Sequence, residues 1–210
     1  MKHLVLFFIL VTGITFVQAQ ERHENDQIRT IFSKDKSNGG YGAFTVGYTQ
    51  IDGKDALITG GRGAFIFDHS LAVGLAGYGF ANNLEYNTYY QEQPLGYWLA
   101  GGYGGIFIEP IVGGTMPVHL SFPVLFGVGG AALIENYGYN HWDDYPFNEL
   151  DNDVFFVIEP AVELECNIVR WFRTAASVSY RYTSKVELFG TDEDVFRGFN
   201  FALTFKFGKF

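Results

Sequence analysis

The sequence predicts an all-β fold, an eight-stranded antiparallel up-and-down transmembrane β-barrel. Three observations support this prediction. The end of the chain alternates between apolar and polar residues, eight segments of similar length alternate in the same way, and the connections between them are alternately short and long. Hydrophobic residues make up 48% of the chain and aromatic residues 18%, yet no stretch after the N-terminal 19 residues is long and apolar enough for a membrane helix.

The C-terminal strand carries the clearest alternation. One side of an extended chain would present Phe199, Phe201, Leu203, Phe205 and Phe207, and the other side Asn200, Ala202, Thr204 and Lys206. An edge strand with a wholly apolar face promotes aggregation, unless the sheet closes on itself. A closed barrel leaves no free edge strand, and the apolar face can lie in the hydrocarbon of a membrane. Phe210 falls outside this alternation, and a bulge at Gly208 would restore it.

Eight segments have the length that a tilted strand needs to cross a membrane. They cover residues 40–51, 55–67, 70–81, 97–109, 117–133, 154–166, 170–183 and 198–210. The second, fourth and sixth connections are short, whereas the third, fifth and seventh are long. Outer-membrane barrels have short periplasmic turns and longer outer loops, so we expect both chain ends in the periplasm. The first connection, around Asp52-Gly53, is the exception, because it is short and faces outward.

Charged and apolar residues separate onto opposite faces of these segments. The expected lumen charge network consists of Arg62, Glu109, Glu159, Glu163, Glu165, Arg173, Arg181 and Lys206. A charge facing lipid costs about 2–4 kcal/mol at the midplane, so the charges should pair inside. We therefore expect a polar, plugged interior without an open pore, in which Gly60, Gly101, Gly127 and Gly129 make room for long charged side chains. Expected interfacial aromatics are Tyr41, Tyr48, Tyr78, Tyr97, Trp98, Tyr137, Trp142, Trp171 and Tyr182.

The predicted organisation has three parts. Residues 1–19 resemble a cleaved signal peptide, with Lys2 before an apolar run and Ala19 at the cleavage site. We expect residues 20–38 to form a flexible periplasmic segment and residues 39–210 to form the barrel. We expect export to the cell outer membrane. The net charge of −9 argues against nucleic acid as a partner, and the single cysteine, Cys166, excludes an internal disulfide.

One pair of residues suggests catalysis. His119 and Ser121 share a strand face, and Glu159 or Glu163 on the next strand could orient the histidine. An H-x-S pair with a Glu resembles that of the lipid A 3-O-deacylases, which implies acyl transfer. Against this, the pair points inward and lies near the expected periplasmic end. We therefore favour a hydrogen-bonded interior histidine, no enzymatic activity and no cofactor.

The third and fifth connections are the expected ligand-binding loops, because aromatic residues are concentrated there. These residues are Tyr86, Tyr89, Tyr90, Tyr137, Tyr139, Trp142 and Tyr145. The fifth connection, 135–153, is also acidic, and its clustered oxygens could hold a divalent cation such as calcium. Its spacing does not match the EF-hand pattern, so a solvated acidic loop without a metal is the favoured alternative. A glycan or another surface ligand is the expected occupant of these loops.

Several segments resemble a family of Bacteroidetes outer-membrane β-barrel proteins without an assigned function. They are residues 39–43, 60–67, 77–79, 102–110, 117–125 and 205–210. The architecture is similar to that of small OmpA/OmpX-type barrels. This resemblance implies a monomer in outer-membrane lipid that the barrel-assembly machinery inserts, with a structural or cell-surface interaction role. The alternatives are a lipid-modifying enzyme on the same fold and a secreted soluble barrel of lipocalin type.

Overall fold

The computed structural model describes residues 38–82, 88–90, 93–136, 147–188 and 190–210, and every regular element in this part of the chain is a β-strand. The strands are β1 (Asn38–Ile51), β2 (Lys54–Phe67), β3 (Leu71–Asn82), β4 (Thr88–Tyr90), β5 (Gln93–Val112), β6 (Val118–Ser121), β7 (Val124–Asn136), β8 (Phe147–Val169), β9 (Phe172–Thr183) and β10 (Gly198–Lys209). The described residues contain no helix of the length and apolarity that a membrane crossing requires. The predicted signal peptide lies outside them.

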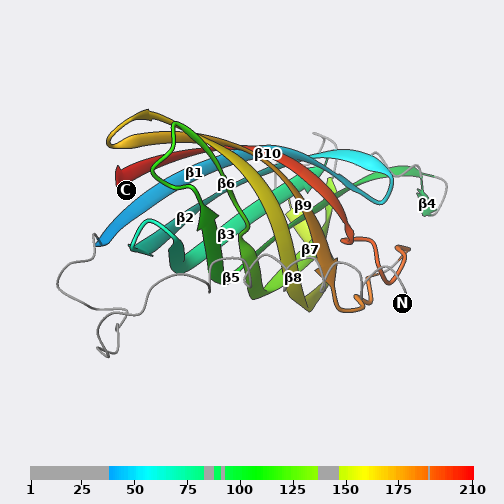
Figure 1. The fold of residues 1–210 in the computed structure, drawn as a ribbon. Helices are drawn as coiled ribbons and strands as arrows, with labels where there is room; N and C mark the ends of the chain where they lie inside the picture. Colours follow the sequence, from blue (N-terminus) through cyan, green and yellow to red (C-terminus); the bar gives the residue numbers. More distant parts are fainter. Residues whose placement is uncertain (1–37, 83–87, 91–92, 137–146, 189) are drawn as a thin grey trace, which may run out of the picture. The chain divides into compact units, whose positions relative to one another are not determined.

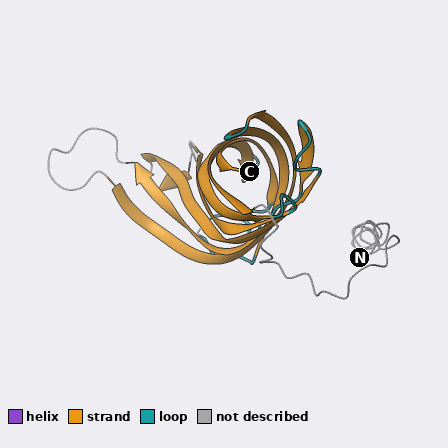
Figure 2. Ribbon diagram, turned by 60° about the vertical axis from the view of Figure 1, so that its left-hand side comes forward, coloured by secondary structure: helices purple, strands orange, loops and turns teal. Residues whose placement is uncertain are grey.

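The strands form a closed antiparallel ring (Figure 1). From β1 the ring runs through β10, β9 and β8 to β6 and β7, then through β5 and β3 to β2, which pairs with β1 again. β6 and β7 together act as one interrupted strand, and β4 pairs with β5 outside the ring, so the ring has eight strands. Figure 2 shows the strands curving around this closed wall. The predicted fold class is confirmed.

The connections place the two ends of the barrel. Connections 68–70, 113–117 and 170–171 lie at the end where β1 begins and β10 ends, which we call the turn end. The opposite end, the loop end, contains the β1–β2 turn and connection 184–197. Asp52 and Gly53 of that turn have φ angles of 54° and 67°. Positive φ at both positions matches a type I′ turn, whose twist fits the flanking strands and sets Ile51 opposite Lys54.

Proline interrupts one wall of the barrel. The sequence predicts a single strand over 117–133, whereas Pro123 separates β6 from β7. The Phe122 amide donates a hydrogen bond to the Pro110 carbonyl at 2.9 Å, and the Ala161 amide donates to the Pro123 carbonyl at 2.8 Å. Neither proline can return a bond, because proline has no N–H. The predicted strand is therefore divided, although the ring stays closed.

Side chains alternate between the two faces of the wall along each strand. On the outer face, the exposed fractions are 72% for Phe156, 60% for Phe199 and 53% for Leu203. On the inner face, Glu165 and Arg181 are 0% exposed. An outer surface this apolar would be unfavourable in water, and it suits hydrocarbon.

The interior is less polar than expected. Its buried cluster includes Ile58, Leu99 and Phe107. At the loop end the Phe196 ring stacks on Phe155 at 5.1 Å and packs at an angle against Phe80 at 5.2 Å. The inward glycines accommodate rings rather than ions. A Cβ atom at Gly60, Gly101 or Gly129 would come within 2.6 Å of Tyr78, Phe80 or Phe155, respectively.

Three further expectations need correction. Tyr41 and Tyr78 are not interfacial, because both occupy inward positions of their strands and pack against the core. The β1–β10 register continues without a bulge through Gly208. Phe210 therefore lies inside the turn end, with its ring 5.9 Å from the Tyr41 ring and 4.0 Å from the guanidinium carbon of Arg173.

Candidate functional site

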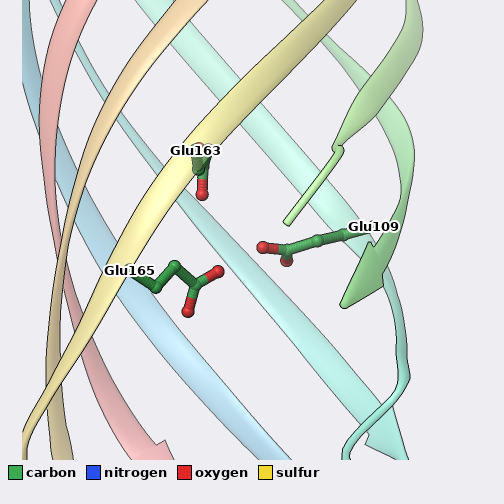
Figure 3. Close-up of side chains that lie close together, drawn as sticks. All are labelled: Glu109, Glu163 and Glu165. Atoms are coloured by element: carbon green, nitrogen blue, oxygen red, sulfur yellow. The ribbon is translucent and has the colours of Figure 1, made fainter. Parts of the chain in front are cut away.

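Three carboxylates meet inside the barrel toward the turn end. Glu163 and Glu165 occupy alternate inward positions of β8, and Glu109 comes from β5, with β6 lying between the two strands. Figure 3 shows the three side chains pointing toward one another. One oxygen from each lies within 4.8 Å of the others, and all three side chains are buried. This spacing is short enough for one cation to contact all three groups.

Lys206 supplies that cation. Its Nζ atom lies 2.5 Å from Glu109, 2.6 Å from Glu165 and 3.1 Å from Glu163. Arg62 binds Glu163 at 2.6 Å, Arg173 lies 3.5 Å from Glu165, and the Tyr41 hydroxyl donates to Glu109. Three buried carboxylates thus face three buried cations. The ammonium group occupies the position that a metal ion would need. The positive charges of Lys206, Arg62 and Arg173 therefore balance the negative charges of the three carboxylates.

His119 and Ser121 belong to the same cluster, but they are not arranged as a nucleophile and its base. The Ser121 hydroxyl donates to Glu165 at 2.5 Å, with Glu163 at 3.4 Å. His119 Nε2 lies 3.2 Å from Glu165 and 3.4 Å from Arg173 Nη1. Because both residues contact Glu165 rather than each other, this arrangement lacks the direct bond through which a histidine activates a serine. The contacts are those of a buried hydrogen-bond network.

Glu159 and Arg181 lie nearer the loop end and have different partners. Glu159 accepts hydrogen bonds from three neutral groups, Tyr103 at 2.5 Å, Ser179 at 2.5 Å and Asn200 at 2.7 Å. Arg181 donates from Nε to the main-chain oxygen of Phe196 at 2.6 Å. A cavity of about 50 Å³ lies in the lumen beside Glu159 and Arg62. It has room for about one or two water molecules.

The expected binding loops lie mostly outside the described residues. This applies to Tyr86, Tyr137, Tyr139, Trp142 and Tyr145, while Tyr89 and Tyr90 belong to strand β4. Asp153, at the end of the acidic fifth connection, accepts hydrogen bonds from the amides of Val154 and Glu187, both at 2.7 Å. This aspartate therefore helps to hold connection 184–197. The role of the two aromatic loops stays a prediction.

Connection 184–197 folds into the mouth of the barrel, which the sequence reading did not anticipate. Val186, Leu188, Val195 and Phe196 are all buried there. Its carboxylates and Lys185 are exposed, and the hydrogen bond from Lys185 to Glu193 raises the pKa of Lys185. The available signal in the sequence is the presence of five apolar residues in a segment whose length suggests an outer loop. The four buried residues close the loop end.

Comparison with known proteins identifies the fold. No family model matches the chain, and no curated protein matches it in sequence. The structure of Neisserial surface protein A matches with a TM-score of 0.52 and 11% identity, over 82% of this chain and 97% of that one. Ail, the attachment invasion locus protein of Yersinia pestis, matches with a TM-score of 0.50 and 13% identity, over 82% of this chain and 99% of that one. At these identities the likeness establishes a shared small-barrel fold.

Proposed function

We propose that the protein is a small outer-membrane β-barrel with a structural or cell-surface interaction role and with its loop end facing outward. One observation carries this proposal, namely the distribution of polarity across the barrel wall. Phenylalanine and leucine side chains cover the outside, while glutamate, arginine and lysine side chains are buried inside. A soluble barrel of lipocalin type requires the opposite distribution, with a polar exterior and an apolar ligand cavity.

The proposal of a surface role draws on the similar structures. Their names describe one as a surface protein and the other as an attachment protein. We extend this kind of role to the present chain, with the aromatic third and fifth connections as the contact region for a ligand or glycan. The same proposal has four further parts. The chain would belong to the Bacteroidetes family and be cleaved after Ala19. It would be a monomer that the barrel-assembly machinery inserts into the membrane.

Fractionation and gel mobility test the proposal. We expect the mature protein to remain with the outer membrane and to need detergent for extraction. We also expect the folded protein to shift in mobility on heating, because a closed barrel resists unfolding by cold detergent. A protein that is soluble after secretion without detergent would contradict the proposal. Mass spectrometry of lipid A from cells with and without the protein tests the enzymatic alternative, and we expect unchanged acylation.

A further inference from the structure

Arg181 is the one lumen cation of the predicted network that has no carboxylate within ion-pair distance among the described residues. It is 0% exposed, and its Nη1 atom has no hydrogen-bond partner. Its guanidinium carbon lies 5.3 Å from the Phe80 ring and 5.5 Å from the Tyr103 ring. A buried charge without a counterion is strongly unfavourable, so this arrangement calls for an explanation.

Phe196 contributes both an oxygen atom and a nearby ring to the surroundings of this cation, beside the Phe80 and Tyr103 rings. Its main-chain oxygen accepts the bond from Arg181 Nε at 2.6 Å, whereas Thr49 Oγ1 is a distant second acceptor at 3.5 Å. Its side-chain ring stacks on Phe155 at 5.1 Å and packs against Phe80 at 5.2 Å. A single loop residue thus places an aromatic ring in an apolar pocket and an oxygen atom on a buried cation.

We propose that the loop end of the barrel is a binding site for an amphipathic anion, a carboxylate joined to an aromatic ring or short apolar chain, and that Phe196 occupies this site in the closed state. A carboxylate carries a full charge and can bind two guanidinium nitrogens at once, whereas a carbonyl oxygen carries a partial charge. The anion would therefore satisfy Nη1 as well as Nε. The apolar part of the ligand would replace the Phe196 ring against Phe80 and Phe155.

Entry of the ligand requires connection 184–197 to move outward. Polar contacts join both of its arms to the barrel wall. Asp153 accepts a hydrogen bond from the Glu187 amide at 2.7 Å, Ser184 and Phe156 exchange two hydrogen bonds, and Arg197 Nε donates to the Thr183 carbonyl at 2.9 Å. The described residues of this connection form no strand, and a segment without ladder pairing opens at lower free energy than the strands that it covers. The site concerns the mouth of the barrel itself and does not depend on which surface partner the outer loops contact.

The experiment uses the full chain, folded in detergent micelles, with 3-phenylpropanoate as the probe. The variant Phe196→Ala removes the ring and leaves the main chain, so the ring pocket becomes vacant, while the acid must still displace the carbonyl oxygen of residue 196 from Arg181. We expect saturable binding of the acid to this variant by calorimetry, at least about tenfold tighter than binding of the neutral 3-phenylpropan-1-ol. The wild-type protein should bind the acid more weakly, because the ligand must first displace Phe196.

Two comparisons make the result specific. Adding Arg181→Gln to Phe196→Ala should abolish the preference for the acid over the alcohol, whereas the lipid-face variant Leu203→Ala should behave as the wild type does. Heat-dependent gel mobility confirms that each variant is folded. Equal binding of acid and alcohol to Phe196→Ala would overturn the proposal, and this comparison does not require the double variant to fold. If Phe196→Ala does not fold, the wild-type protein at higher ligand concentration provides the same comparison.

Discussion

Replacing Lys206 by methionine is expected to destabilise the folded barrel by about 3–5 kcal/mol, the usual cost of removing one partner from a buried ion pair. The ammonium group of Lys206 contacts Glu109, Glu163 and Glu165, and its side chain is 1% exposed. Without it, three carboxylates would share only Arg62 and Arg173 inside a wall that admits little water. Urea titration of the refolded protein, followed by gel mobility, measures the loss.

Lys209→Met is the matched control, because Lys209 is an exposed lysine on the same strand. We expect this control to stay within about 0.5 kcal/mol of the wild type. Adding Glu109→Gln to Lys206→Met should recover part of the loss, since Lys206 is the only cation that Glu109 contacts among the described residues. Equal stability of the two methionine variants would contradict the assignment of Lys206 as the central counterion.

Leu203→Arg is expected to cost about 2–4 kcal/mol in a bilayer, because Leu203 lies near the middle of β10 on the outer face. An arginine at this position must enter hydrocarbon or distort the membrane around it. Reversible unfolding in lipid vesicles measures the difference in free energy. In a water-soluble barrel the same change would replace an exposed leucine by a charge at little cost.

Phe199→Arg provides the depth control. Phe199 shares the outer face but lies at the loop end of β10, where the arginine can reach the headgroups. We expect a membrane contribution of about 0–1 kcal/mol there. The loss of the edge-on contact with the Tyr180 ring, at 5.0 Å, adds a small packing term that Phe199→Ala measures separately. Equal costs at the two depths would argue against a membrane around this strand.

The strands and their faces could be predicted because one physical constraint acts on every residue of a barrel wall. Period-2 alternation sends Phe201 and Leu203 outward and Thr204 and Lys206 inward, without any knowledge of the partners. The constraint determines whether a side chain points into or out of the barrel, but not which residues it contacts. Whether Lys206 meets Glu109 or Glu159 depends on the curvature of the wall and on distances across the lumen, which the alternation does not contain.

Prediction fails where the place of a residue along a strand and the direction of its side chain point to different environments. Tyr41 and Tyr78 lie near strand ends, where aromatic residues are common at the interface, but their strand positions point inward. Connection 184–197 has the length of an outer loop, but it contains Phe196 and three other apolar residues that are buried in the mouth. Loop length does not show where the apolar side chains of a connection pack.

Accessibility scanning along β10 tests the central claim most directly. Single cysteines at positions 199–207, in a background without Cys166, would carry spin labels in protein reconstituted into vesicles. We expect labels at 199, 201, 203, 205 and 207 to collide with oxygen dissolved in lipid, and labels at the even-numbered positions between them to be shielded from both oxygen and a water-soluble nickel reagent. High nickel accessibility at the odd-numbered positions would show that water surrounds this face and would contradict the account.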